Sequence, residues 1–200
     1  MAIEIELKLA VPEDALPLVS QHPIIAAAPR LAVEVLDNTY FDTPALTLQA
    51  HKMALRLRAE GGQIVQTVKC AAASHGGLAH RPEWEQTYRG VFDFSAIDDV
   101  ETARLLEKAR DELIPVFTAR FQRDTRRYQS RPGVDILIML DTGWIDAGGQ
   151  RTPVCELELE LARGEADDLR QLAAILRRDL PLTPDDRSKA QRGYELFLRR

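Results

Sequence analysis

Acidic side chains recur at every second position in two short segments near opposite ends of this chain. Successive side chains of a β-strand point to opposite faces, so Glu4, Glu6 and Lys8 would share one face of a strand over residues 3–9. Residues 155–161 repeat the alternation with three more acids, Glu156, Glu158 and Glu160. Glu is a poor strand former and stacked like charges repel, so the two strands need a counter-charge. Carboxylate oxygens are the ligands that Mg²⁺ and Mn²⁺ prefer, which makes a bound metal ion the obvious candidate.

Basic side chains follow the same alternation in other segments. Arg56 and Arg58 alternate with leucines, and Lys69 follows Val65 and Thr67 on one face. A further segment places one basic and two acidic residues on a single face, namely Arg81, Glu83 and Glu85. Arginine binds phosphate oxygens in a planar fork, and lysine adds a point charge. Phosphoryl transfer needs mainly positioning and charge stabilisation, which a metal ion and these cations would supply together.

Two arrangements of such strands remain open. In the first, the charged faces contact solvent and the apolar faces form the core of a sandwich. In the second, the charged faces point into a wet lumen, and amphipathic helices cover the apolar faces outside. Acids concentrate on some strands and Arg or Lys on others, whereas a solvated surface would intersperse both signs. This segregation favours the lumen.

Enough strands and helices are predicted to build a closed barrel. Alternation and turn residues predict strands over residues 2–10, 31–42, 53–59, 63–70, 81–89, 116–129, 134–141, 143–147 and 154–161. Helices are expected after Pro12 and over residues 101–113, 165–179 and 188–198. The Pro- and Ala-rich segment 23–30 is expected to be irregular, and residues 74–77 to form a loop.

Composition limits the class of protein. A chain of 200 residues can bury one core, so we expect a single domain over residues 1–200. No apolar run approaches the span of a bilayer and no signal peptide precedes the first strand, which indicates a cytoplasmic protein without membrane contact. A net charge of −5 argues against nucleic-acid binding but leaves room for an anion at a local basic cluster. No P-loop motif is present in the sequence.

Several motifs occur in an order that resembles one known family. The segment from Glu4 to Lys8 resembles the ExExK signature of the CYTH superfamily, also called triphosphate tunnel metalloenzymes. Other matching pieces follow in the family's order over nearly the whole chain, at residues 38–43, 53–58, 67–69, 140–143, 156–160 and 188–193. Residues 76–83 and 153–161 look most like the bacterial inorganic triphosphatase subgroup.

The resemblance implies an α+β fold: an eight-stranded antiparallel β-barrel with a charged lumen and amphipathic helices outside. It also implies hydrolysis of inorganic triphosphate to pyrophosphate and phosphate with Mg²⁺ or Mn²⁺. The metal ligands implied are Glu4, Glu6, Glu158, Glu160 and Asp141. The phosphate-binding residues implied are Lys8, Arg56, Arg58, Lys69, Arg81, Arg123 and Lys189. The catalytic residues implied are Glu4, Glu6, Lys8, Glu85, Glu158 and Glu160.

Some assignments stay open within the resemblance. Glu83, Glu85 and Asp141 would bind a second metal ion or water, or orient the basic residues. Arg123 matches the family best on its strand, while Arg120 and Arg126 have the opposite strand parity. No role is implied for Glu156, and Lys189 and Arg192 could be solvated on a short helix.

The expected ligand is inorganic triphosphate or another triphosphate anion. Rival activities within the superfamily are adenylate cyclase, thiamine triphosphatase and general nucleoside triphosphatase. A rival of another kind is a non-catalytic polyphosphate-binding module. Proteins of the bacterial subgroup often carry a C-terminal helical CHAD domain, so this chain would be either a stand-alone form or an excised domain.

Overall fold

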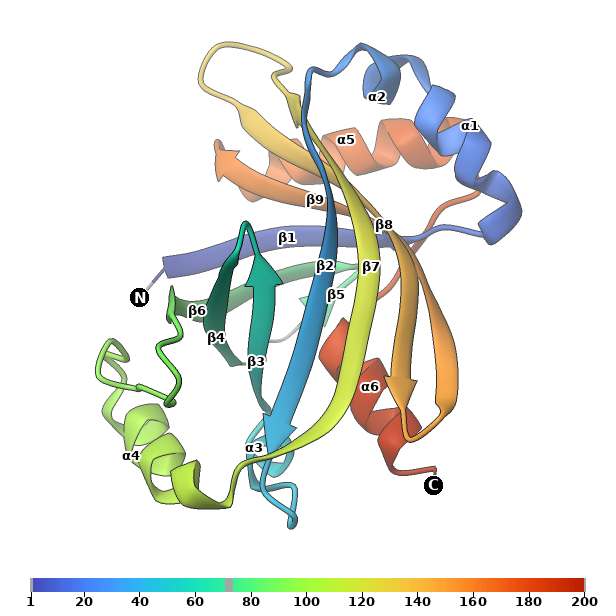
Figure 1. The fold of residues 1–200 in the computed structure, drawn as a ribbon. Coiled ribbons are helices and arrows are strands. Elements are labelled where there is room, and N and C mark those ends of the chain that lie inside the picture. The colour runs from blue at the N-terminus through green and yellow to red at the C-terminus, as the bar shows by residue number, and fades with distance from the viewer. Residues whose placement is uncertain (1, 71–73, 200) are drawn as a thin grey trace.

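The alternating segments pair into one closed antiparallel sheet (Figure 1). The computed structural model describes residues 2–70 and 74–199. Eight strands form the barrel: β1 (Ala2–Ala10), β2 (Arg30–Asp42), β3 (Met53–Glu60), β4 (Gln63–Cys70), β6 (Leu78–Thr87), β7 (Ile114–Tyr128), β8 (Asp135–Ala147) and β9 (Gln150–Arg163). Their order is β1-β9-β8-β7-β2-β3-β4-β6, and pairing of β1 with β6 closes the ring. The expected eight-stranded antiparallel barrel with outer helices is confirmed.

Short strands and helices decorate this barrel. The two short strands are β5 (Ser74–His75), paired with β6, and β10 (Thr183–Pro184), paired with β1. The helices are α1 (Leu16–Gln21), α2 (Pro23–Ala27), α3 (Thr47–Ala50), α4 (Val100–Ala109), α5 (Ala166–Asp179) and α6 (Lys189–Phe197), with 3₁₀ turns at Glu13–Ala15 and Arg110–Glu112. None of the helices described here combines the length and the apolar character needed to cross a bilayer.

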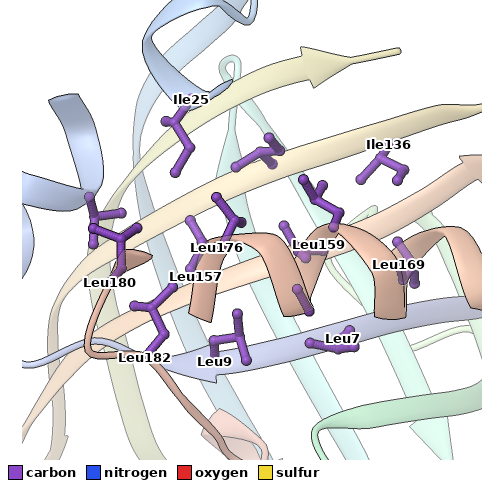
Figure 2. Packing of buried hydrophobic residues seen from close by; sticks show 14 of the residues in the cluster. Leu7, Leu9, Ile25, Ile136, Leu157, Leu159, Leu169, Leu176, Leu180 and Leu182 are labelled. Carbon is purple, nitrogen blue, oxygen red and sulfur yellow. The ribbon is translucent and has the colours of Figure 1, made fainter. Parts of the chain in front are cut away.

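Helix α5 covers the outer faces of the strands that carry the acidic motifs. Its N-terminus is closed by a capping box between Glu165 and Asp168. Its apolar face packs on β1, β8 and β9, as Figure 2 shows for a buried cluster that includes Leu7, Leu9, Ile136, Leu157, Leu159, Leu169 and Leu176. Each such side chain contributes about 1.5–3 kcal/mol when fully buried. The leucines between the glutamates therefore hold β1 and β9 in place and leave the glutamates inside.

Helix α4 likewise covers the outer faces of β3, β4 and β6. Leu106 of the helix packs with Leu55, Val68 and Trp84 on the outer side of these strands. The indole nitrogen of Trp84 donates a hydrogen bond to Asp98 at 2.8 Å. The bulky residue between Glu83 and Glu85 thus belongs to the outer core, and the two glutamates point inward.

Helix α6 is tied to the end of β2 through a buried carboxylate. Asp42 is fully buried and accepts hydrogen bonds from the backbone N–H groups of Thr43, Leu48 and Gln49 and from the Tyr194 hydroxyl at 2.8 Å. Asp42 therefore caps the turn that follows β2. The same carboxylate holds the loop around α3 and the helix α6 together at one end of the barrel.

The bond between Asp42 and Tyr194 yields a testable stability effect. We expect Tyr194→Phe to lower the free energy of unfolding by about 1.5–3 kcal/mol, because the hydrogen bond goes to a charged, buried carboxylate. Urea unfolding followed by circular dichroism measures the change. Tyr88→Phe, at a ring that packs on Phe92 with centroids 5.4 Å apart, is the matched control. Equal midpoints for Tyr194→Phe and the unmodified chain would contradict the anchoring role.

Three expectations from the sequence are wrong. The segment 23–30 contains a helix, because Pro23 occupies the first helical turn, where its missing N–H group costs nothing. The strands expected at 134–141 and 143–147 are one continuous strand, β8. Gly143 does not break it. A Cβ at this position would lie 2.2 Å from the Arg120 carbonyl oxygen, so glycine permits the close approach of the paired strands β7 and β8. Residues 74–77, expected to form a loop, include the short strand β5, which pairs with β6. His22, next to Pro23, is buried against Asp179 with a ring nitrogen to carboxylate distance of 3.3 Å.

Candidate active site in the barrel lumen

The barrel encloses a cavity of about 680 Å³, lined by side chains from all eight barrel strands and α6. Nearly all of the site residues inferred from the sequence line it: Glu4, Glu6, Lys8, Arg56, Arg58, Lys69, Arg81, Glu85, Arg123, Glu158, Glu160 and Lys189. Asp141 is the exception; it is fully buried behind Arg123 and Lys189. The structure thus brings together the charged faces that are scattered over the sequence.

One group of charges joins β1, β4 and β6. Glu4 lies 2.8 Å from the Lys69 ammonium and 2.6 Å from Arg81 Nε, and Glu6 lies 2.5 Å from Arg81 Nη2. Lys69 also lies 3.1 Å from Glu83. Burial alone would raise the pKa of Glu4, but Lys69 and Arg81 outweigh it and lower that pKa to about 2. Glu4 is therefore ionised at neutral pH.

A second group joins β7, β8, β9 and α6. Oxygens of Asp141, Glu156 and Glu158 lie within 4.8 Å of one another, a spacing that could hold a metal ion. The Lys189 ammonium contacts all three carboxylates, at 2.6 Å from Asp141 and 2.9 Å from Glu158. Arg123 adds contacts of 2.6 Å to Asp141 and 2.5 Å to Glu158. These carboxylates thus already share two cations from the protein itself.

The sequence left Glu156, Lys189 and Arg192 without firm places, and the structure puts them together. Glu156 is buried, and its carboxylate contacts Lys189 and lies 2.9 Å from Arg192 Nη1. Lys189 is 8 % exposed and points into the lumen, so it is not a solvated surface residue. These ion pairs link β9 to a helix more than thirty residues later in the chain. No residue spacing within either segment predicts them.

Negative charge is in excess between the two groups. Register pairs Glu6 with Glu160 and Lys8 with Glu158 across β1 and β9. Burial, then the Glu4 carboxylate, raises the pKa of Glu160 to about 7, and burial together with Glu158 raises the pKa of Glu6. Within residues 2–70 and 74–199, no cation forms an ion pair with Glu160. A divalent cation fits this donor set, because it would supply the charge that the carboxylates lack.

The opposite part of the lumen is basic. Arg56 and Arg58 each place a terminal nitrogen 3.5 Å from Glu85, which also accepts a hydrogen bond of 3.0 Å from Thr67. Burial raises the pKa of Glu85, but the two arginines outweigh it, so this pKa is lowered and the carboxylate stays ionised. Arg58 also lies 2.9 Å from Glu60, and Arg56 lies 4.0 Å from Glu83. Both guanidinium groups line the cavity, and their donors suit phosphate oxygens.

Lys8 differs from the other buried cations of the lumen. Its side chain is 4 % exposed, and no described carboxylate lies within ion-pair distance of its ammonium. Burying a charge without a partner is costly. An anion in the cavity would supply the missing partner.

Strand β7 contributes one arginine to the lumen. Arg123 points inward, whereas Arg120 lies outside and pairs with Asp37 at 3.3 Å. Arg126 also points outward, where Nη1 donates to the Ile25 carbonyl at 3.0 Å near the end of α2. The lumen also holds apolar side chains that the charge pattern did not reveal: Leu36, Phe121, Leu137 and Met139. The Phe121 ring lies 4.7 Å from the Lys189 ammonium.

The geometry defines an antiparallel tunnel barrel with a charged lumen that pairs carboxylates with anion-binding cations. The family model described as the CYTH domain matches residues 2–194, so the chain belongs to the CYTH family. The resemblance inferred from the motifs is thereby confirmed.

Known proteins extend the comparison. The inorganic triphosphatase of Haemophilus influenzae is 29 % identical over 172 residues, which cover 80 % of this chain and 46 % of that protein. The chain thus spans about half the length of this relative. Among solved structures, a Hippeastrum protein assigned as an adenylyl cyclase and described as having a dominant triphosphatase activity superposes with a TM-score of 0.68 at 19 % identity, covering 96 % of this chain and 95 % of that chain. A Bacillus halodurans protein assigned as an adenylate cyclase gives a TM-score of 0.64 at 19 % identity, covering 96 % and 98 %. At this identity the two structures show a shared fold.

Proposed function

We propose that this chain hydrolyses inorganic triphosphate to pyrophosphate and phosphate with the help of Mg²⁺ or Mn²⁺. One observation carries the proposal: among the described residues Glu160 forms no ion pair, burial and neighbouring carboxylates raise the pKa of both Glu160 and Glu6, and the buried Lys8 ammonium makes no direct contact with a carboxylate. A metal-bound polyphosphate would satisfy both at once. The relative named inorganic triphosphatase supports the same activity.

The metal ion would be held by Glu6, Glu158 and Glu160, with Glu4 as a further ligand. When bound, it would neutralise charge on the carboxylates and on the phosphate oxygens. Asp141 contacts Arg123 and Lys189, which supports an orienting role among those that the resemblance allows.

The phosphate chain would lie against the basic part of the lumen. Lys8, Arg56 and Arg58 would contact its oxygens, together with Lys69, Arg81 and Arg123. Water attacks the terminal phosphorus, the bond to the bridging oxygen breaks, and pyrophosphate leaves with that oxygen. Glu85 is ionised and borders the cavity, so it would accept a hydrogen bond from the attacking water and orient it.

A substrate panel tests the activity. Phosphate release is measured from inorganic triphosphate, ATP and thiamine triphosphate, each with Mg²⁺, with Mn²⁺ and with EDTA. We expect the highest kcat/KM for inorganic triphosphate and no release in EDTA. Faster release from ATP or thiamine triphosphate would reassign the substrate, and cyclic AMP formation would indicate a cyclase. Tight binding of triphosphate without turnover would favour a binding module.

The raised pKa of Glu160 predicts how pH affects the metal-free protein. A carboxyl group with a pKa of about 7 in the folded state and 4.5 as its ordinary value binds its proton more tightly when folded. Its contribution to stability is therefore full below pH 4.5 and is lost as pH rises through 7. We expect the Tm without metal to fall between pH 5 and pH 8, and Glu160→Gln to flatten this fall.

The same proton competes with a metal ion. The increase in Tm caused by Mg²⁺ should accordingly be larger at pH 8 than at pH 6. Thermal scans of both proteins with and without Mg²⁺ measure the difference. If Mg²⁺ raised the Tm of Glu160→Gln by the same amount as that of the unmodified chain, with the same difference between pH 6 and pH 8, Glu160 would be excluded from the metal site.

A further inference from the structure

The two mouths of the lumen differ in charge. At the end where β3 begins, α3 and α6 flank the cavity (Figure 1), and its lining there includes Gln49, Lys52, Met53, Tyr194 and Glu195. Where β3 ends, the lining includes Glu34, Glu60 and Glu160, of which Glu60 is paired with Arg58 at 2.9 Å. A polyanion is attracted to the first mouth and repelled by the second. Lys52 is the residue that gives the first mouth its cation.

Lys52 occupies a backbone conformation that lysine rarely adopts. Its φ is 57°, in the left-handed region, and the other described non-glycine residue of this kind is Leu46, with a φ of 55°. Both belong to the loop around α3 whose N–H groups are held by Asp42. A left-handed φ is less favourable in free energy for a non-glycine residue than for glycine. A lysine kept in this strained conformation is therefore expected to make a favourable side-chain contact that glycine could not make.

The Lys52 side chain makes no ion pair or hydrogen bond with the residues that the structure describes. It is exposed at the mouth, and no described carboxylate forms an ion pair with it. Glu195, at the same mouth, is directed to Arg187 at 3.9 Å. Arg56, Arg58, Lys69, Arg81 and Arg123, deeper inside, all contact carboxylates. Lys52 is thus free to contact an anion that enters from solvent.

The position of Lys52 fixes which part of an anion it would meet. A strand rises about 3.3 Å per residue, so Met53 at the start of β3 lies roughly 10 Å along the strand from Arg56 and roughly 17 Å from Arg58, and Lys52 directly precedes Met53. A phosphate chain seated against Arg56, Arg58 and Lys8 would reach Lys52 with its outer end. A longer linear chain reaches this mouth more fully than triphosphate does.

We propose that Lys52 is a phosphate-binding residue at the α3–α6 mouth and that it favours linear polyphosphates longer than triphosphate. This proposal rests on the proposed function, because it assumes a phosphate chain in the lumen. Lys52 binds the outermost phosphate, while the residues around Lys8 and Arg56 hold the end that is cleaved. The strain at residue 52 is retained because the ammonium contacts substrate.

The test compares tri- and tetrapolyphosphate in the variants Lys52→Gly, Lys52→Met and Lys52→Arg. We expect kcat/KM for tetrapolyphosphate to fall about 5- to 10-fold in the Gly and Met variants, mainly through KM, and to fall less than 2-fold for triphosphate. Lys52→Arg should keep most of the preference. The difference should shrink at high ionic strength, since the contact is exposed. Lys108→Met, on α4 and away from the lumen, is the matched control.

Lys52→Gly adds a readout that a purely structural lysine would not give. Glycine relieves the left-handed strain, so its Tm should stay equal or rise while the tetrapolyphosphate KM increases. An unchanged ratio of kcat/KM for the two substrates in Lys52→Gly would overturn the proposal.

Binding separates this proposal from the hydrolytic one. Calorimetric titration with tetrapolyphosphate in EDTA measures the contact without turnover. Weaker binding by Lys52→Gly supports the role of Lys52 even if no substrate is hydrolysed. Equal binding by Lys52→Gly and the unmodified chain refutes that role even if hydrolysis is found.

Discussion

Glu6→Gln is expected to reduce metal-dependent triphosphate turnover by at least about 100-fold and to leave the fold intact. Loss of a metal ligand that helps stabilise the transition state costs several kcal/mol, and about 3 kcal/mol corresponds to roughly 100-fold in rate. The fold should survive, because burial and Glu158 already raise the pKa of Glu6, and glutamine removes that repulsion. Arg81 keeps its contact with Glu4. Steady-state kinetics over a range of Mg²⁺ concentrations, together with Tm, measure both effects.

Glu34→Gln is the control for this experiment. Glu34 also lines the cavity but is exposed at the acidic mouth, outside the set of proposed ligands. Its turnover should stay within about threefold of the unmodified chain, in keeping with the small effects of exposed charges. Full turnover by Glu6→Gln at saturating Mg²⁺ would remove Glu6 from the metal site.

One substitution at two lysines of the lumen should give opposite outcomes. We expect Lys8→Met to preserve stability and to lower kcat/KM for triphosphate by about 10- to 100-fold. The reason is that Lys8 has no ion-pair partner among residues 2–70 and 74–199, while a hydrogen bond to a charged phosphate is worth about 1.5–3 kcal/mol. Phosphate-release kinetics and urea unfolding measure the two quantities.

Lys189→Met should instead destabilise the fold by about 3–5 kcal/mol. Its ammonium is enclosed by Asp141, Glu156 and Glu158, and removing it leaves buried carboxylates with too little positive charge. The two unfolding midpoints provide the comparison. Equal unfolding midpoints for Lys8→Met and Lys189→Met would contradict a substrate-binding role for Lys8 and a structural role for Lys189.

The barrel was predictable because alternation of charged and apolar residues fixes the two faces of each strand. The leucines between Glu156, Glu158 and Glu160 pack under α5, and so the glutamates face inward. Sequence alone could not show that Gly143 lies where two neighbouring strands approach closely. A glycine within a strand pattern equally suggests that the strand ends there. The helix at Pro23 was missed because its five residues carry no apolar period long enough to detect.

The site was predictable where its residues belong to strands and less so where a helix contributes. Strand parity placed Arg123 inside and Arg120 outside. The contacts of Lys189 with Glu156 and Asp141 depend on how α6 docks, and that docking depends on Tyr194 and Asp42, which lie 152 residues apart. Long-range pairs of this kind leave no local periodicity.

The closing strand of the barrel has a consequence for how the protein folds. β1 is synthesised before the other seven barrel strands, whereas its partner β9 (Gln150–Arg163) is the last of them along the chain. Pairings that span most of the chain are slow to form, because closing a long loop costs conformational entropy before any stabilising contact is made. The charged side chains of β1, Glu4, Glu6 and Lys8, therefore remain exposed to solvent until β9 has been synthesised. The chain acquires its charged interior in the final folding step.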